Sequence, residues 1–293
     1  MRFSATVALL ACGSGILCPA GSHSEQWPIR EQETVRRTLT LSGPPMRLVV
    51  DNIDGHVHVM GSAGSSVRVT AHKTIRAETA SDLGQAKGEV KLDFNEHPGS
   101  VSIYYDAPWR CNGEGRGCTG ERHRFYNVTY DIDVEVPREA RSVLSTVNNG
   151  DVRLDSTAGD FDAGNINGGI YLNAISGSGD VHTINGPISV HFAKNPSGRC
   201  SLKTINGQMD VFFPQELSAD LLFKTFNGQI YSDFDVAPRA TPAAQTERRD
   251  GKFVYRSNRL SGGRAGHGGP ELTFDAFNGS IRLHRETSGA SNQ

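Results

Sequence analysis

Apolar and polar positions along the chain repeat a short pattern, in which an apolar residue is followed by Asn, Gly, a variable residue and a second apolar residue. Three close copies occupy residues 183–188, 204–209 and 225–230, so each copy stands 21 residues after the previous one. Looser copies surround Asn149-Gly150, Asn167-Gly168 and Asn278-Gly279, and an early relative is found at residues 53–57. A pattern that recurs at a nearly constant spacing indicates a repeated structural unit.

Side chains alternate between apolar and polar after each glycine, as in Val152-Arg153-Leu154 and Ile188-Ser189-Val190. This period of two predicts half-buried strands. An Asn-Gly pair between strands is, taken alone, typical of a type I′ hairpin in an antiparallel sheet. The regular period of 18–21 residues favours one coil of a solenoid instead, in which parallel strands stack about 4.8 Å apart. The sequence therefore predicts an all-β fold, a parallel β-solenoid or β-helix-like architecture built from Asn-Gly strand repeats.

The Asn-Gly pairs are expected to form the corners of the solenoid, because these residues tolerate a positive φ, here expected at Gly207 and Gly228. Stacked asparagine amides would hydrogen-bond to one another from coil to coil. The apolar residues before the asparagines are expected to form a ladder in the core; they are Ile184, Ile205, Phe226 and Phe277. The predicted corner residues are Asn149, Gly150, Asn167, Gly168, Asn185, Gly186, Asn206, Gly207, Asn227, Gly228, Asn278 and Gly279.

Three other segments interrupt the repeat. Residues 78–91 carry Leu83, Ala86 and Val90 at helical spacing and predict one short helix. Strands at 101–104 and 130–136 bracket residues 108–124, which are expected to form an exposed loop closed by cysteines. A polar segment with Pro and Gly, residues 235–271, is expected to be a mobile insertion.

The first 20 residues have the form of a signal peptide, with one positive charge followed by a stretch of apolar and small residues. Cleavage after Ala20 would leave a lead-in at 21–39, the repeat domain at 40–286 and a tail at 287–293. A second interpretation places a lipid on Cys12, because Leu9-Leu10-Ala11-Cys12 resembles a bacterial lipobox. No apolar run long enough to span a bilayer follows the signal. We therefore expect an extracytoplasmic protein, in the periplasm, on the cell surface or secreted.

Export makes disulfides permissible. Cys111 and Cys118 bracket six residues, three of them glycine, so we expect these two cysteines to form a disulfide. Cys200 is then the odd thiol. A zinc site is the alternative, but three cysteines without a C-x-x-C pair make a poor one.

Composition narrows the function classes. The chain has 37% hydrophobic and 21% charged residues, a composition that is typical of globular proteins. Its net charge of -2 gives no sign of the basic surface that nucleic-acid binding requires. The sequence also lacks the common hydrolase, metalloprotease, nucleotide-loop and calcium-repeat motifs. We expect no catalytic, cofactor-binding or metal-binding residues, and hence no enzyme.

Residues 134–137, residues 146–152, the serial Asn-Gly strands and a late Gly-Gly-Pro before Leu272 resemble the bacterial putative-adhesin family, also called domain of unknown function 4097. The resemblance covers about residues 40–286 and lies in the rhythm and order of segments. It implies a parallel β-solenoid with an extracytoplasmic, adhesive role, and it implies no catalytic residues.

Several groups of polar residues allow a second interpretation as a binding or catalytic site. His56 and His58 share one strand face and would ligate a metal only with a third ligand, so a solvated face is preferred. Asp151, Asp180 and Asp210 recur near corners but in different registers, which favours an acidic rim over calcium or glycoside chemistry. The glycine-rich residues 262–269 precede a strand, so a flexible connection is preferred to a phosphate loop.

Aromatic residues gather around the cysteine loop and form the candidate recognition surface, for a glycan or an envelope protein. They are Trp109, Tyr104, Tyr105 and Tyr126. The leading hypothesis is a non-enzymatic, adhesin-like binding protein of the envelope or surface. The alternatives are a polysaccharide-acting enzyme, with Arg153, Asp180 and Lys203 in an exterior groove, and a periplasmic scaffold for a membrane signalling partner.

Overall fold

A computed structural model describes residues 27–41, 43–110, 125–214, 216–239, 245–249, 252–256 and 261–286 of the 293-residue chain. The expected signal peptide at 1–20, the lipid site at Cys12, the tail at 287–293 and the Cys111–Cys118 disulfide lie outside the described residues.

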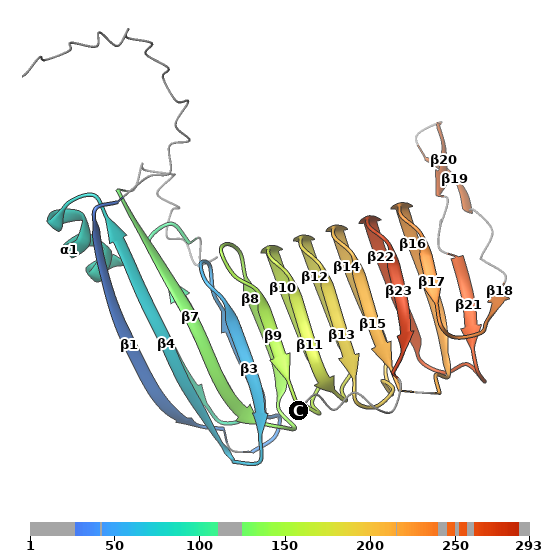
Figure 1. Ribbon diagram of the computed structural model, residues 1–293, viewed down its shortest axis with the longest axis horizontal. Coiled ribbons are helices and arrows are strands. Elements are labelled where there is room, and N and C mark those ends of the chain that lie inside the picture. Colours follow the sequence, from blue (N-terminus) through green and yellow to red (C-terminus); the bar gives the residue numbers. More distant parts are fainter. Residues whose placement is uncertain are drawn as a thin grey trace, which may run out of the picture.

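The protein is all-β and contains two large mixed sheets (Figure 1). The ten-stranded sheet has the order β1 (Ile29–Thr40), β4 (Ser66–Ala77), β7 (Tyr126–Pro137), β3 (Val57–Ser62), β9 (Val152–Asp155), β11 (Ile170–Ile175), β13 (Ile188–Phe192), β15 (Met209–Phe213), β23 (Ile281–Arg285) and β17 (Ile230–Ser232). The eleven-stranded sheet has the order β18 (Val236–Arg239), β21 (Ser261–Ala265), β16 (Ala219–Asn227), β22 (Glu271–Asn278), β14 (Cys200–Asn206), β12 (Gly179–Asn185), β10 (Phe161–Asn167), β8 (Arg141–Thr146), β2 (Arg47–Asp51), β6 (Ser100–Asp106) and β5 (Lys91–His97). A separate hairpin pairs β19 (Gln245–Arg249) with β20 (Lys252–Arg256).

The central strands of both sheets pair in parallel, and antiparallel strands lie toward the ends. From β8 to β17, and again from β22 to β23, a strand of the eleven-stranded sheet is followed by one of the ten-stranded sheet. We call each such pair a rung. Inward side chains of both sheets form one buried core, as in Val181 of β12 and Val190 of β13. The alternation read from the sequence therefore marks the buried positions within the strands.

The last rung of the sequence does not lie at the end of the row. β22 pairs with both β14 and β16, and β23 pairs with both β15 and β17. Figure 1 shows this as red strands standing between yellow and orange ones. Asn278 is consequently in register with Asn206 on one side and with Asn227 on the other.

The corner glycines do not have the expected conformation. Gly207 and Gly228 lie outside the left-handed region, so the predicted positive φ is wrong. The close approach of neighbouring corners explains these glycines instead. A Cβ on Gly207 would lie 1.9 Å from the carbonyl oxygen of Gly186, and one on Gly228 would lie 2.0 Å from that of Gly279. Each corner passes directly against the backbone of the next, and this contact excludes any side chain.

The predicted helix is confirmed as α1 (Ala80–Glu89). Thr79 caps it through a capping box with Asp82, and Ala86 is buried. The helix contacts β4 and β7 at the end of the molecule opposite the last rungs (Figure 1).

The insertion at 235–271 contains strands where a mobile connection was expected. β21 pairs antiparallel with β16 and with β18, so part of the glycine-rich run belongs to a sheet. Gly266, Gly268 and Gly269 then turn the chain with positive φ into β22. The backbone of β21 therefore hydrogen-bonds to the edge of β16, which the composition of this segment did not indicate.

Candidate functional site

Asparagine side chains form a hydrogen-bonded ladder along the row of corners. Each amide nitrogen donates to the amide oxygen of the asparagine in the neighbouring rung, over 2.8–2.9 Å. The order of the ladder is Asn148, Asn167, Asn185, Asn206, Asn278 and Asn227. One predicted member is wrong: Asn148 occupies the first position, while Asn149 has φ 56 and donates to Asp54. The ladder has a direction, because the side-chain nitrogen of each asparagine from Asn167 onward donates toward the Asn148 end.

A second row, which the sequence reading missed, holds the corners from inside. Thr183, Thr204 and Thr225 are in register, and each hydroxyl donates to the carbonyl of a corner glycine in the neighbouring rung over 2.9–3.1 Å. Asn165 does the same with its amide, and it donates to Gly150 over 3.0 Å. The sequence did carry a signal for this row, because a Thr precedes the apolar residue in all three close copies of the repeat.

The apolar residues before the asparagines lie outside, so the ladder expected in the core is wrong. Ile184 is 39% exposed, Ile205 46%, Phe277 46% and Phe226 62%. The reason is geometric: the preceding Thr points inward, and successive strand residues point to opposite faces. We call the exposed row the apolar ridge; it consists of Ile166, Ile184, Ile205, Phe277 and Phe226.

The apolar ridge is continuous and ordered. Its members follow the register of the asparagines beside them, and the rings of Phe226 and Phe277 stack with centroids 5.1 Å apart. Two residues earlier on the same strand face stand charged residues, including Lys224, which lies 3.0 Å from Asp275. This exposed apolar row is the candidate interaction surface of the protein.

The expected aromatic recognition patch is largely part of the core. Tyr105 and Tyr126 are 1% and 5% exposed, so their expected surface position is wrong. The Trp109 ring is partly buried, and its centroid lies 6.5 Å from that of Tyr105 and 6.3 Å from that of Tyr126. The guanidinium of Arg110 covers Tyr104 at 4.1 Å. A recognition role for Trp109 and Tyr104 stays a prediction.

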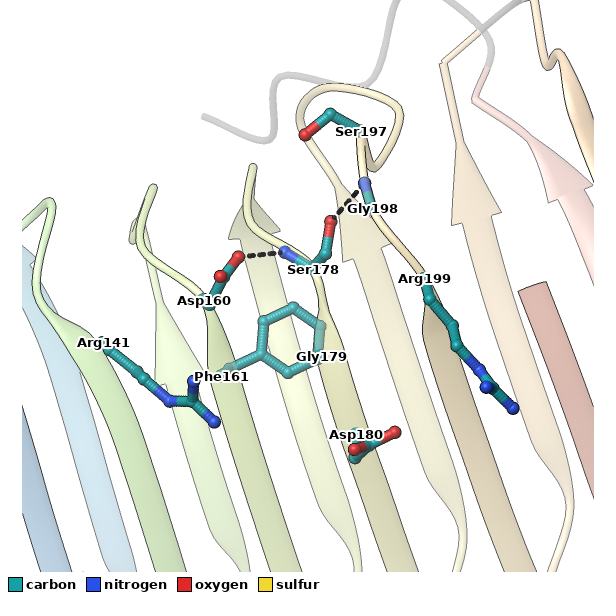
Figure 2. Close-up of a pocket in the computed structure, with 9 residues that line it drawn as sticks. All are labelled: Arg141, Asp160, Phe161, Ser178, Gly179, Asp180, Ser197, Gly198 and Arg199. Atoms are coloured by element: carbon teal, nitrogen blue, oxygen red, sulfur yellow. Dashed lines mark hydrogen bonds between the residues drawn. The ribbon is translucent and has the colours of Figure 1, made fainter. Parts of the chain in front are cut away.

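A polar pocket of about 320 Å³ opens at one end of the strands of the eleven-stranded sheet (Figure 2). Asp160 accepts a hydrogen bond from the Ser178 backbone over 3.0 Å, and the Ser178 hydroxyl accepts one from Gly198 over 2.9 Å. The lining residues are Arg141, Asp160, Phe161, Ser178, Gly179, Asp180, Ser197, Gly198 and Arg199.

The pocket offers charge of both signs but no arranged nucleophile. None of its lining residues is a histidine, cysteine or lysine that could activate Ser178. Cys200 is buried beside it, and burial raises the pKa of its thiol to about 11, so it remains protonated at neutral pH. The pocket suits a small polar or charged group of a ligand.

The three residues named for the alternative of a polysaccharide-acting enzyme do not share one sheet. Arg153 lies on β9 of the ten-stranded sheet, whereas Asp180 and Lys203 lie on β12 and β14 of the other sheet. Asp210 is likewise on the ten-stranded sheet, where it lies 3.0 Å from His284. Asp180 and Asp210 therefore do not share a sheet, which agrees with their different positions relative to the corner glycines.

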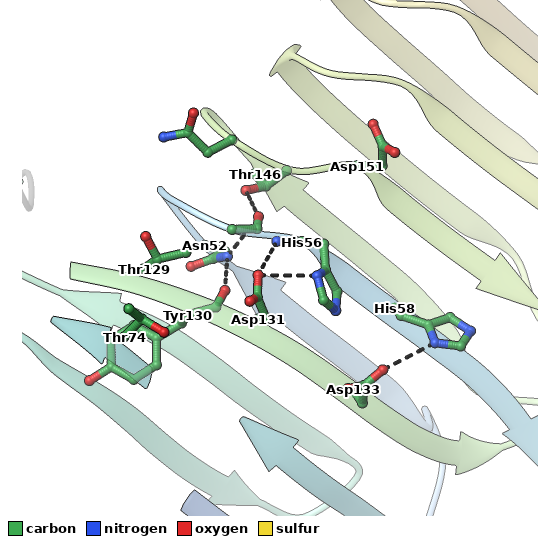
Figure 3. Close-up of polar contacts among 12 residues, drawn as sticks. Asn52, His56, His58, Thr74, Thr129, Tyr130, Asp131, Asp133, Thr146 and Asp151 are labelled. Atoms are coloured by element: carbon green, nitrogen blue, oxygen red, sulfur yellow. Dashed lines mark hydrogen bonds and ion pairs between the residues drawn. The ribbon is translucent and has the colours of Figure 1, made fainter. Parts of the chain in front are cut away.

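The two predicted strand histidines each contact aspartates of neighbouring strands (Figure 3). His56 Nδ1 lies 3.1 Å from Asp131 Oδ1, and the His56 backbone donates to the same oxygen. The hydrogen bond between the two side chains raises the pKa of His56 above its usual value and lowers the pKa of Asp131. His58 lies between Asp133 and Asp155, at 3.2 and 2.8 Å. These contacts join β3 to β7 and β9.

The described residues contain no group of three or more His, Cys, Asp or Glu side chains placed to hold a metal ion. Within the same residues, no helix combines the length and hydrophobicity needed to cross a membrane.

Solved structures with a distant likeness to this chain include the following two. A putative cell adhesion protein from Clostridium sporogenes aligns with 87% of this chain and 100% of its own, at 8% identity and a TM-score of 0.45. A putative lipid binding protein from Parabacteroides distasonis aligns with 87% of this chain and 97% of its own, at 10% identity and a TM-score of 0.28. No family model and no curated protein matches the sequence, so domain of unknown function 4097 is not confirmed.

Proposed function

We propose that this protein is an exported, non-enzymatic binding protein of the cell envelope or cell surface, with an adhesin-like role and a parallel β-solenoid as its frame. The apolar ridge is its binding surface. The observation that carries this proposal is the exposure of Ile205 and Phe226, at 46% and 62%, within an ordered row. Parallel pairing and the asparagine ladder support the solenoid frame.

The chemistry of the apolar ridge favours a protein partner over a glycan. Three of its five members are isoleucines, which offer no ring face on which a sugar can stack. Aliphatic and aromatic side chains in a row fit the apolar side chains of a protein surface. The ridge is held by the paired corners beneath it, so little conformational entropy is lost on binding. An envelope protein is therefore the proposed partner.

The test measures binding of the labelled protein to cell envelopes with and without prior protease treatment. Replacing Ile205 with Ser removes an apolar contact from the middle of the ridge, so binding is expected to weaken about tenfold, equivalent to about 1.4 kcal/mol. Met60→Ser is the matched control, because Met60 is also 46% exposed but lies on β3 of the ten-stranded sheet. It is expected to bind like the wild type.

Several outcomes would contradict the proposal. Equal binding by Ile205→Ser and wild type moves the contact elsewhere, and a loss in Trp109→Ala alone would return it to the aromatic residues near the cysteine loop. Binding that survives protease treatment, or that occurs on protein-free lipid vesicles, argues against a protein partner. Release of soluble sugar from the envelopes would favour a polysaccharide-acting enzyme, with Asp160 and Asp180 in the pocket.

A further inference from the structure

The rung formed by β16 and β17 has an uncovered side. Residues 226–233 are all exposed, although Ile230 and Ser232 are in register with the buried Ile281 and Leu283 of the neighbouring strand. Ile230 shows this most clearly, because it is 39% exposed while its counterparts in register, Ile281, Met209 and Ile188, are 0% exposed. Ile230 therefore occupies a core position that no strand covers among the described residues.

The backbone of β17 is also open on this side. Gln229 accepts a hydrogen bond from Ile281 over 2.9 Å, and Asp233 donates one to Leu283 over 3.0 Å. Because backbone groups alternate in direction along a strand, Ile230 and Ser232 direct their N–H and C=O groups away from β23. Among the described residues, no strand pairs with this edge. An unpaired edge is a template for another strand.

The direction of the asparagine ladder specifies what such a strand would carry. Asn227 donates to Asn278, so its own amide oxygen is the last acceptor of the ladder within the described residues. Asn206 presents the same acceptor to Asn278 inside the molecule. An incoming Asn would donate to Asn227, its Gly would pass the corner at Gly228, and the apolar residue two positions later would cover Ile230.

The molecule already contains such an addition. β22 and β23 follow an insertion in the sequence, yet they pair in parallel with β14 and β15 on one side and with β16 and β17 on the other. The face of a rung therefore accepts a strand that does not follow it directly in the chain.

We propose that the open side of β17, at residues 226–232, binds by parallel strand addition an extended segment of another polypeptide that carries the motif apolar-Asn-Gly-variable-apolar. This site shares only Phe226 with the apolar ridge and does not depend on the function proposed for the ridge. Its specificity comes from the asparagine acceptor and the side-chain-free corner, and its affinity from the backbone groups of the edge.

The test uses a labelled peptide of residues 271–286, which contains Phe277-Asn278-Gly279-Ser280-Ile281. Saturable binding to the full chain is expected, measured by fluorescence anisotropy. A charge on the edge opposes strand addition, so Ile230→Lys is expected to weaken binding at least about tenfold. Ile184→Lys is the matched control, because Ile184 is also 39% exposed but lies on the apolar ridge. A peptide with Gly279→Val is expected not to bind.

The outcomes separate the competing explanations. Equal binding to wild type and Ile230→Lys means that the peptide replaced β22 and β23 in the interior, and this overturns the proposal. Self-association of the full chain that Ile230→Lys abolishes, without peptide binding, means that two copies pair edge to edge, which also overturns it. Loss of envelope binding in Ile184→Lys with intact peptide binding would show that the two surfaces act independently.

Discussion

At the scale of single residues, the corners depend on the absence of side chains rather than on left-handed backbone. A Cβ at Gly186 would lie 2.0 Å from the carbonyl oxygen of Gly168, and one at Gly279 would lie 1.8 Å from that of Gly207. The positive φ expected from the sequence at Gly207 and Gly228 is the wrong reason for glycine at these positions. Asn-Gly permits both explanations, and only the stacking of one corner on the next distinguishes them.

This contact predicts the effect of the smallest possible substitution. Gly207→Ala places a methyl group against the Gly186 carbonyl, and the resulting overpacking is expected to lower the free energy of unfolding by about 1–3 kcal/mol. Urea unfolding measures this change. Gly84→Ala is the control, since no atom lies within 4 Å of a Cβ there and the residue is in α1; it is expected to gain about 0.5–1 kcal/mol. A stabilised Gly207→Ala would show that neighbouring corners stand further apart.

At the scale of elements, the sequence predicted the strands, the short helix and the all-β class, because each has a period that burial imposes on its side chains. It misplaced Ile184 and Phe226, because the preceding Thr183 and Thr225 point inward and successive strand residues point to opposite faces. The aromatic residues near the cysteine loop were misplaced for a related reason: Tyr105 and Tyr126 alternate into the core within β6 and β7. The polar pocket carries no sequence signal, since its residues come from four separate segments of the chain.

One position in the row of inward-pointing threonines is occupied by an alanine, and a threonine can be introduced there. Ala276 is in register with Thr204 and Thr225, so a threonine there is placed to donate to the Gly207 carbonyl. Ala276→Thr is expected to raise the free energy of unfolding by about 0.5–1.5 kcal/mol, the net value of one hydrogen bond. The comparison is with Ala276→Val, which has the same shape without the hydroxyl. If both variants have the same thermal midpoint, the hydroxyl makes no bond in this row.

At the scale of the whole molecule, the rungs form one row, and the chain does not fill that row in sequence order (Figure 1). The rung of β22 and β23 contributes four large side chains at 0–1% exposure, Leu272, Phe274, Ile281 and Leu283, packed within the row. Such an arrangement brings together strands that are distant in sequence, which slows folding because long loops must close first. The row is complete only once its final residues are in place.

This order predicts unequal effects of two C-terminal truncations. A chain that ends at residue 270 loses the four large buried side chains named above, whose burial contributes about 6–12 kcal/mol, which is comparable with the total stability of a typical domain. We expect it to lose its cooperative thermal transition and to bind a dye specific for exposed apolar surface. A chain that ends at residue 286 keeps the rung and is the control, expected to unfold like the full chain. The opposite result, a cooperative transition for the shorter chain near the wild-type midpoint, would mean that β16 and β17 close directly onto β14 and β15, which carry the same motif 21 residues earlier.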